Sequence, residues 1–201
     1  MRVTVIDYKA GNLTSVLKAL RFLGAAPDVA GVPEPIGSAE RIILPGVGHF
    51  AATRRLDETG LTPAIREAVG RGVPFLGICV GMQWLFAGSS EAPGQPGLGF
   101  FDERCTRFPD GAEKVPHVGW NSLEICGDSR LLAGIQHGEF VYFTHSYLAP
   151  VTRSTAAAAH YIEPFTAAIE RGNVMGVQFH PEKSGEAGLR VLRNFLEIAP
   201  C

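Results

Sequence analysis

Cys79 stands between two glycines in the segment Gly77–Gly81, directly after a short apolar run. A run of this length predicts a buried strand, and Met82, Leu85 and Phe86 then follow at helical spacing. A Gly-x-Cys-x-Gly sequence between a strand and a helix is typical of a nucleophile elbow, a strained turn that flanking side chains would crowd. Such a turn places the thiol at a helix N-terminus, where the dipole favours a thiolate. The alternative is a buried structural cysteine, but the glycines favour a nucleophile.

His180 is the best placed of the six histidines to act as the base that a cysteine nucleophile needs. It follows the apolar run 174–179, and catalytic groups gather at the carboxyl ends of strands in open parallel sheets. Glu182 comes two residues later and could accept a hydrogen bond from one imidazole nitrogen while the other nitrogen faces the thiol. This would be a Cys–His–Glu triad. The alternative is a surface turn of His-Pro-Glu sequence.

Two further features could serve a polar substrate. A glycine-rich loop follows the apolar strand 42–44, and its backbone N–H groups, those of Gly46, Val47 and Gly48, could face a developing oxyanion. An ordinary strand-ending turn is the alternative, and the spacing is not that of a phosphate-binding loop. Gln83 lies four residues after Cys79, on the same helix face, and could hydrogen-bond a substrate. A solvated helical glutamine is the alternative.

Strands and helices alternate through the first half of the chain, which predicts right-handed crossovers and a parallel sheet. Here we expect strands at 3–6, 27–32, 42–44 and 73–78, and helices opened by Gly11-Asn12 and by Thr62 as N-cap. The middle of the chain instead predicts strands separated by turns, before a last strand at 173–179 and a final helix capped by Ser184. The predicted fold is α/β: an open, mostly parallel central sheet flanked by helices, with an antiparallel segment in the middle. We expect one domain over residues 1–201.

The composition excludes several classes of protein. A formal net charge of −2 indicates no partner among nucleic acids or anionic membranes. The four cysteines are scattered without a Cys-x-x-Cys pair, which argues against a zinc site and a disulfide framework. The N-terminus has no signal-peptide plan, and no apolar run approaches the length of a membrane span. We therefore expect a cytoplasmic protein without metal or cofactor, in a compartment where a free thiol survives.

Taken together, these features resemble the class I, or triad-type, glutamine amidotransferases. The cysteine and His-Pro-Glu segments are shared by that superfamily. The Gly-Asn-Leu and Lys-x-Pro-His-x-Gly-Trp-Asn segments are more similar to one branch, the glutaminase subunits of imidazole glycerol phosphate synthase. Lys9-Ala10 departs from the small pair expected before Gly11, at no catalytic position. The matching segments span the chain in family order: 6–8 with 11–13, 45–50, 76–83, 114–121, 142–147 and 176–184.

The resemblance implies a reaction and a role for each catalytic group. Cys79 would attack the side-chain amide of glutamine and form a thioester. His180 would protonate the departing ammonia and then activate water, and Glu182 would orient His180. The loop of Gly46, Val47 and Gly48 would form the oxyanion hole, with the Val47 N–H as donor after a peptide flip. The requirement for an acid is chemical, because an amide is a poor leaving group until it is protonated.

The resemblance also implies a substrate site and a partner. Gln83 and the backbone near His145 and Ser146 would hold the amino-acid end of glutamine. A TIM-barrel cyclase subunit would receive the ammonia directly, in a heterodimer that makes imidazole glycerol phosphate and an aminoimidazole carboxamide ribotide. The alternative for the interface residues is plain surface, and Trp120 argues most strongly against it. The residues implied at this interface are Asn12, Pro116, His117, Trp120, Tyr142 and Lys183.

Three other functions remain open from the sequence. The chain could be a glutaminase that feeds another acceptor, such as anthranilate or aminodeoxychorismate, although segment 114–121 argues against this. It could be a free-standing cysteine hydrolase on a flavodoxin-like sheet. It could also be a non-catalytic regulatory subunit, although the intact set of Cys79, His180 and Glu182 argues against loss of activity.

Overall fold

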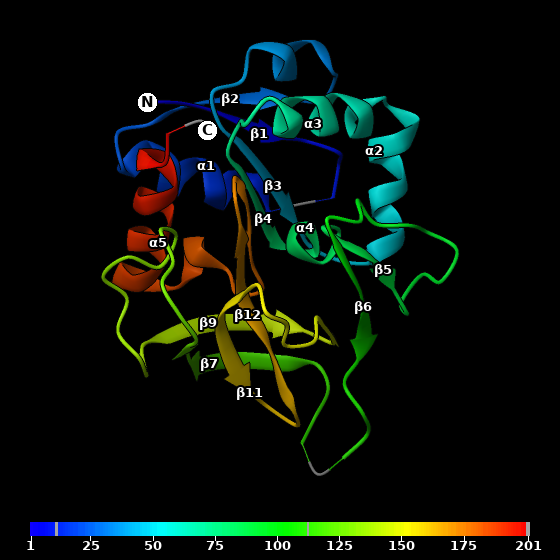
Figure 1. Ribbon diagram of the computed structural model, residues 1–201, viewed down its shortest axis with the longest axis vertical. Helices are drawn as coiled ribbons and strands as arrows, with labels where there is room; N and C mark the ends of the chain where they lie inside the picture. Colours follow the sequence, from blue (N-terminus) through cyan, green and yellow to red (C-terminus); the bar gives the residue numbers. More distant parts are fainter. Residues whose placement is uncertain (11, 112, 200–201) are drawn as a thin grey trace.

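A long mixed sheet runs through the centre of the protein (Figure 1). The computed structural model describes residues 1–10, 12–111 and 113–199, so Gly11, expected to open the first helix, and Cys201 lie outside the described residues. Among these residues the sheet has eight strands. Their order is β2 (Ala26–Ala30), β1 (Arg2–Ile6), β3 (Ile42–Gly46), β4 (Phe75–Cys79), β13 (Val174–Val177), β12 (Pro164–Arg171), β11 (Thr155–His160) and β8 (Glu124–Ile125).

The first five strands of this order are parallel, and the rest continue the sheet in antiparallel fashion. Every residue of β3 and β4 is buried, since layers of structure cover both faces of the sheet. Strands buried on both faces are continuous apolar runs, which is the pattern seen in the sequence. The predicted mostly parallel α/β sheet is confirmed.

Helices cover the two faces of the sheet. In Figure 1, α1 and α5 lie on one side of the parallel strands, and α2, α3 and α4 lie on the other. Each long helix buries an apolar stripe against the sheet; in α5 this stripe includes Val191, Leu192 and Phe195. The helices are α1 (Leu13–Phe22), α2 (Arg54–Glu58), α3 (Leu61–Gly70), α4 (Val80–Gln83) and α5 (Gly185–Glu197), with short 3₁₀ helices η1 (Glu34–Ser38), η2 (Phe50–Thr53) and η3 (Pro181–Lys183).

Three local expectations were wrong. The helix after Cys79 ends at Gln83, and Phe86 begins a strand, because the chain turns to build a second sheet. Thr62 is not an N-cap: α3 begins at Leu61 and the Thr62 hydroxyl donates to Asp57 at 2.6 Å. Ser184 does hold the N-cap position of α5, but its hydroxyl donates to the His180 carbonyl at 2.7 Å, so the expected side-chain cap is absent.

Two small sheets lie in the middle of the chain, where an antiparallel segment was predicted. One is mixed: it pairs β6 (Phe101–Arg107) in parallel with β5 (Phe86–Ser89) and in antiparallel fashion with β10 (Tyr147–Leu148). The other pairs β7 (His117–Ser122) with β9 (Phe140–His145) in an antiparallel ladder, at the lower end of the molecule in Figure 1. A search of the described helices finds none with the length and apolar character needed to cross a membrane.

Candidate active site

Three neighbouring parallel strands end at the same edge of the sheet and bring the predicted groups together. Gly46 at the end of β3 pairs with Cys79 at the end of β4, and Val177 of β13 pairs with Ile78. The predicted oxyanion loop, the candidate nucleophile and His180 therefore follow adjacent strands at the same edge of the sheet. Ligand sites are expected at such carboxyl ends of parallel strands.

Cys79 occupies the strained turn that its flanking glycines predict. Its backbone has φ 54° and ψ −110°, a combination that residues other than glycine rarely adopt. A Cβ on Gly77 would meet the backbone of Gly81, and a Cβ on Gly81 would meet the carbonyl of Leu44. Glycine is therefore required at both positions by close backbone approach. The following helix α4 has only four residues, so the dipole expected to favour a thiolate is weak.

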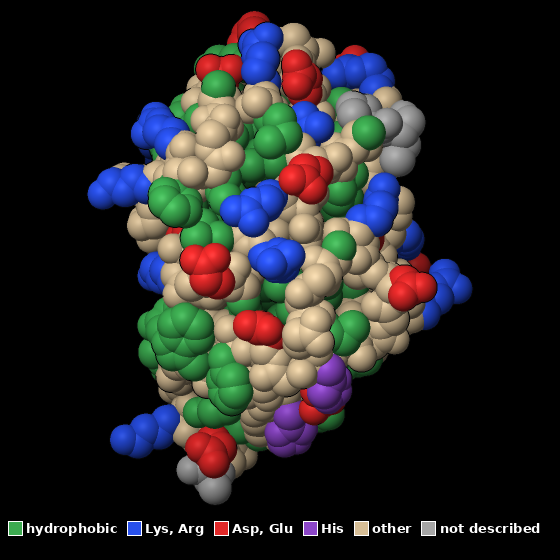
Figure 2. Space-filling model, turned by 90° about the vertical axis from the view of Figure 1, so that its left-hand side faces the viewer, with side chains coloured by type: hydrophobic (Ala, Val, Ile, Leu, Met, Phe, Trp, Pro, Cys, Tyr) green, Lys and Arg blue, Asp and Glu red, His purple; other side chains and the backbone are tan. Residues whose placement is uncertain are grey.

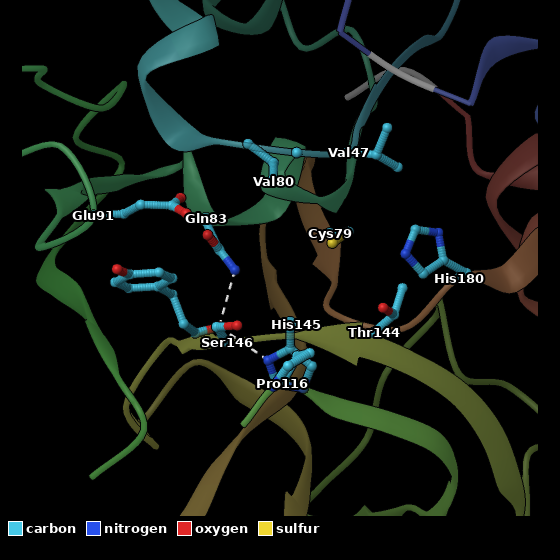
Figure 3. Close-up of a pocket in the computed structure, with 12 residues that line it drawn as sticks. Val47, Cys79, Val80, Gln83, Glu91, Pro116, Thr144, His145, Ser146 and His180 are labelled. Carbon is cyan, nitrogen blue, oxygen red and sulfur yellow. Dashed lines mark hydrogen bonds between the residues drawn. The ribbon is translucent and has the colours of Figure 1, made fainter. Parts of the chain in front are cut away.

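His180 and Glu182 form a buried pair beside Cys79. Their side chains are 2% and 1% exposed, and His180 Nδ1 lies 3.0 Å from Glu182 Oε1. The other ring nitrogen, Nε2, is buried without a hydrogen-bond partner, and Figure 3 shows the ring beside the Cys79 sulfur. Burial opposes the imidazolium, but the Cys79 sulfur and the Glu182 carboxylate together raise the pKa of His180 to about 9. The pair is thus arranged to hold a proton facing the sulfur.

A cavity of about 280 Å³ opens over Cys79 and His180 (Figure 3). Val47 and Gly48 of the predicted oxyanion loop line it, whereas Gly46 is buried beneath, against Tyr8 and Gly81. The cavity walls come from segments far apart in the chain. They are Val47, Gly48, Cys79, Val80, Gln83, Glu91, Pro116, Thr144, His145, Ser146, Tyr147 and His180.

The predicted substrate residues Gln83, His145 and Ser146 all line this cavity. Gln83 is 2% exposed, so it is not a solvated helical glutamine; its Nε2 donates to the Tyr147 carbonyl at 3.0 Å. Both nitrogens of the His145 ring already have partners: Nδ1 lies 2.9 Å from the same carbonyl, and Nε2 lies 3.0 Å from His117 Nδ1. Of these three residues, Ser146 is therefore the one that we expect to contact a ligand in the cavity.

Two residues of the site were missed from the sequence. Glu91 lies in the loop after β5, lines the cavity and accepts a hydrogen bond from the Phe50 N–H at 2.7 Å. Gln178 is fully buried and donates from Nε2 to Cys79 Sγ at 3.5 Å. Gln178 lies in the bend that follows β13, so its position beside Cys79 depends on the pairing of β13 with β4. No local pattern pointed to Glu91.

Comparison with known proteins places the chain in a family. The family model described as "Glutamine amidotransferase class-I" matches residues 4–199. The chain belongs to the class-I glutamine amidotransferases. The subunits named imidazole glycerol phosphate synthase subunit HisH from Methanosarcina acetivorans and Methanothermobacter thermautotrophicus are 46% and 47% identical to it, each match covering 98% of both chains. A solved "glutamine amidotransferase" matches with a TM-score of 0.76 at 22% identity, over 97% of each chain, which supports the fold.

A buried histidine pair lies at the wall of the cavity, which His145 lines. His117 and His145 are opposite each other on β7 and β9, with Nδ1 of His117 3.0 Å from Nε2 of His145. The His117 ring stacks on Phe143 and Tyr161, at centroid distances of 5.0 and 4.2 Å. Burial lowers the pKa of His117 to about 4 and that of His145 to about 3. Both rings are therefore neutral near neutral pH.

The histidine pair should make the amidotransferase sensitive to acid. Histidine in an unfolded chain has a pKa of about 6.5. Below that pH both histidines of the unfolded state are protonated. In the folded state His117 stays neutral down to about pH 4 and His145 down to about pH 3. The stability contributed by the pair is complete above pH 6.5 and is lost as the pH falls through this window. We expect His117→Phe to lose less free energy of unfolding than the unaltered protein between about pH 7 and about pH 5, measured by urea unfolding.

Protonation of carboxylates also lowers the free energy of unfolding at acid pH, but both proteins contain the same carboxylates. The difference between the two proteins therefore measures the contribution of the histidine. Equal losses in both would contradict the prediction.

The residues implied at a partner interface have mixed positions in this amidotransferase. Trp120 is 55% exposed, and Lys183 Nζ lies 5.7 Å from the centroid of the Tyr142 ring. His117 is buried and paired as described. Pro116 lines the active-site cavity, and Asn12 lies directly before α1, against Glu182 and the oxyanion loop.

Proposed function

We propose that this chain is the glutaminase subunit of an imidazole glycerol phosphate synthase. It hydrolyses glutamine to glutamate and ammonia and delivers the ammonia to a cyclase subunit. The observation that carries the proposal is the strained Cys79 turn, which places the thiol beside the buried His180–Glu182 pair in one cavity. The acceptor follows from the relatives, which bear this synthase's name and match at almost full length. A free thiol nucleophile suits the cytoplasm, which we propose as its location.

The geometry supports covalent hydrolysis in two halves. Cys79 Sγ attacks the amide carbon of glutamine, and the Val47 N–H stabilises the oxyanion after a flip of its peptide. His180 Nε2 gives its proton to the leaving nitrogen, the C–N bond breaks, and ammonia leaves a thioester on Cys79. The neutral imidazole then takes a proton from water, which attacks the thioester and releases glutamate. Glu182 holds the Nδ1–H throughout, at 3.0 Å.

The walls of the cavity suit a free amino acid. Glutamine carries an α-ammonium and an α-carboxylate besides its amide. Glu91 is the acidic residue of the described lining, so we propose that its carboxylate binds the α-ammonium. Gln83 and Ser146 line the same cavity and supply polar groups for the rest of the amino-acid end.

The outer face of the β7–β9 sheet is our proposed docking surface for a TIM-barrel cyclase. Val118, Trp120 and Phe140 are each more than half exposed there. Figure 2 shows a group of hydrophobic side chains in the lower half of the molecule, which is where β7 and β9 lie in Figure 1. Thr144, the partner of Val118 across the ladder, lines the active-site cavity. A subunit seated on this face would therefore cover the mouth of the cavity and receive the ammonia before water does.

Trp120→Ala should weaken this assembly. A half-exposed tryptophan at the centre of such a patch is typical of an interface hot spot, worth about 2 kcal/mol or more. We expect the dissociation constant for the cyclase subunit to rise at least about 30-fold, measured by titration calorimetry. Phe22→Ala is the control, because Phe22 is 75% exposed on α1, away from this face. Equal effects of the two substitutions would contradict the docking surface.

The experiment that tests the function is glutamate release from glutamine, with and without the cyclase subunit and its phosphorylated ligand. We expect little activity alone and a large rise in the liganded complex. Strong activity alone, unchanged by the cyclase, would indicate a free-standing hydrolase instead. A rise only with an anthranilate or aminodeoxychorismate synthase partner would reassign the acceptor.

A further inference from the structure

A chain of buried hydrogen bonds reaches the nucleophile from the side opposite to His180. It begins at the backbone carbonyl of Tyr147, which accepts from Gln83 Nε2 at 3.0 Å. The same Gln83 Nε2 lies 3.0 Å from Gln178 Oε1, and Gln178 Nε2 lies 3.5 Å from Cys79 Sγ. Gln83 is 2% exposed, and Gln178 is fully buried. None of these contacts belongs to the Cys79–His180–Glu182 set.

The Tyr147 carbonyl determines the direction of every hydrogen bond in this series. A carbonyl oxygen can only accept, so the amide group of Gln83 that faces Tyr147 must be its NH₂. That NH₂ also faces Gln178, which must then present its oxygen to Gln83. The remaining half of the Gln178 amide, its NH₂, is left to face the sulfur of Cys79. The nucleophile therefore receives an N–H donor whose orientation the fold sets in advance.

The neutral histidine pair strengthens this arrangement. His145 Nδ1 lies 2.9 Å from the same Tyr147 carbonyl and so carries the proton, which leaves Nε2 to accept from His117. His117 Nε2 then accepts from the Asn121 amide at 3.4 Å. Because burial lowers the pKa of both rings, neither charge nor tautomer changes near neutral pH. The carbonyl that orients Gln83 is thus held from both sides.

We propose that Gln178 is a positioning residue for Cys79, which donates a fixed hydrogen bond to the sulfur and so stabilises its thiolate and aims it into the cavity. This inference deepens the proposed function. It rests on that function for the role of Cys79 in glutamine hydrolysis, but the contact between Gln178 and Cys79 stands without it. The other titratable groups beside the sulfur are His180 and Tyr8, whose hydroxyl is buried without a partner. Neither replaces an amide donor, because His180 is engaged in proton transfer and Tyr8 lies against the oxyanion loop at Gly46.

The test is the alkylation of Cys79 by iodoacetamide in Gln178→Leu, followed peptide by peptide with mass spectrometry over a range of pH. A hydrogen bond to a charged group is worth enough to change a rate at least about tenfold. We expect Cys79 in the variant to react about tenfold more slowly near neutral pH and to approach the normal rate in strong alkali, where thiols ionise without help. Superimposable pH profiles for the two proteins would overturn the proposal.

Two controls separate this effect from general damage. Cys126 is exposed, so its alkylation in the same samples should be equal in both proteins. Asn173→Leu removes two hydrogen bonds of 2.9 Å from a side-chain amide next to the opposite end of β13, and should leave the Cys79 profile unchanged. A slowing of Cys79 in Asn173→Leu equal to that in Gln178→Leu would also overturn the proposal.

A second variant covers the case in which Gln178→Leu does not fold. Gln178→Glu keeps the size of the side chain but places a carboxylate oxygen where the donor stood. At alkaline pH we expect Cys79 to react at least about tenfold more slowly than in the unaltered protein, since an ionised carboxylate would repel the thiolate. Normal reactivity of Cys79 in this variant would overturn the proposal. Alkylation needs neither glutamine nor a partner, so failure of the proposed function would not hide the result.

Discussion

Glutamate release is expected to fall at least about 1,000-fold when Cys79 is replaced by serine. The hydroxyl is almost isosteric with the thiol, so the elbow and the cavity are retained. A serine hydroxyl, however, is a far weaker acid than a thiol, so beside the same His180 it stays protonated near neutral pH and is a much poorer nucleophile. The measurement is release of glutamate by the complete complex at saturating glutamine.

A double substitution provides the control for this result. Residues that act as one catalytic unit are not additive, so Cys79→Ser combined with His180→Asn should be no slower than Cys79→Ser alone. A further large loss in the double variant would mean that His180 acts independently of Cys79. Substantial activity in Cys79→Ser would remove Cys79 as the nucleophile.

The second large effect is on folding. Gly81→Ala should lower the free energy of unfolding by about 3 kcal/mol or more, because the new Cβ would collide with the carbonyl of Leu44. The obstacle is backbone of the neighbouring strand β3, so no side chain can move aside to relieve it. Urea unfolding, or the yield of folded protein where the variant does not fold, measures the loss.

Gly70→Ala is the matched control for Gly81→Ala. Gly70 ends α3, has ordinary helical backbone, and a Cβ there would meet nothing within 4 Å. Alanine is the better helix former, so we expect this variant to be as stable as the unaltered protein or slightly more stable, by about 0.5–1 kcal/mol. A Gly81→Ala variant as stable as this control would contradict the close approach of Gly81 and Leu44.

The features that the sequence predicts well are those encoded in neighbouring residues. The apolar runs at 42–44 and 73–78 predict strands that are buried on both faces, and Gly77 and Gly81 predict the turn that Cys79 occupies. His180 and Glu182 are two residues apart, so one short segment contains both members of a hydrogen-bonded pair. Local spacing is sufficient evidence in each of these cases.

The features that the sequence does not predict depend on contacts between distant segments. Glu91 looks like an ordinary loop carboxylate until β9 and the oxyanion loop close the cavity beside it. Gln178 resembles any polar residue at a strand end until β13 lies beside β4 and brings it to Cys79. Thr62 and Ser184 have the composition of N-caps, but their hydroxyls donate to Asp57 and to the His180 carbonyl, and the Ser184 hydroxyl also accepts from the distant Tyr142 N–H.

The position of β13 in the sheet has a consequence for the order in which this protein becomes active. β13 is one of the last elements of the chain, yet it lies in the interior of the sheet, between β4 and β12. A chain still being synthesised can pair β4 with β3 but has an open edge where β13 belongs, and it lacks Gln178 and His180. The proposed nucleophile, Cys79, is therefore synthesised before its proposed base, His180, and the pairing of β13 with β4 brings the two together. We therefore expect no glutamine hydrolysis from a chain in which β13 has not yet joined the sheet.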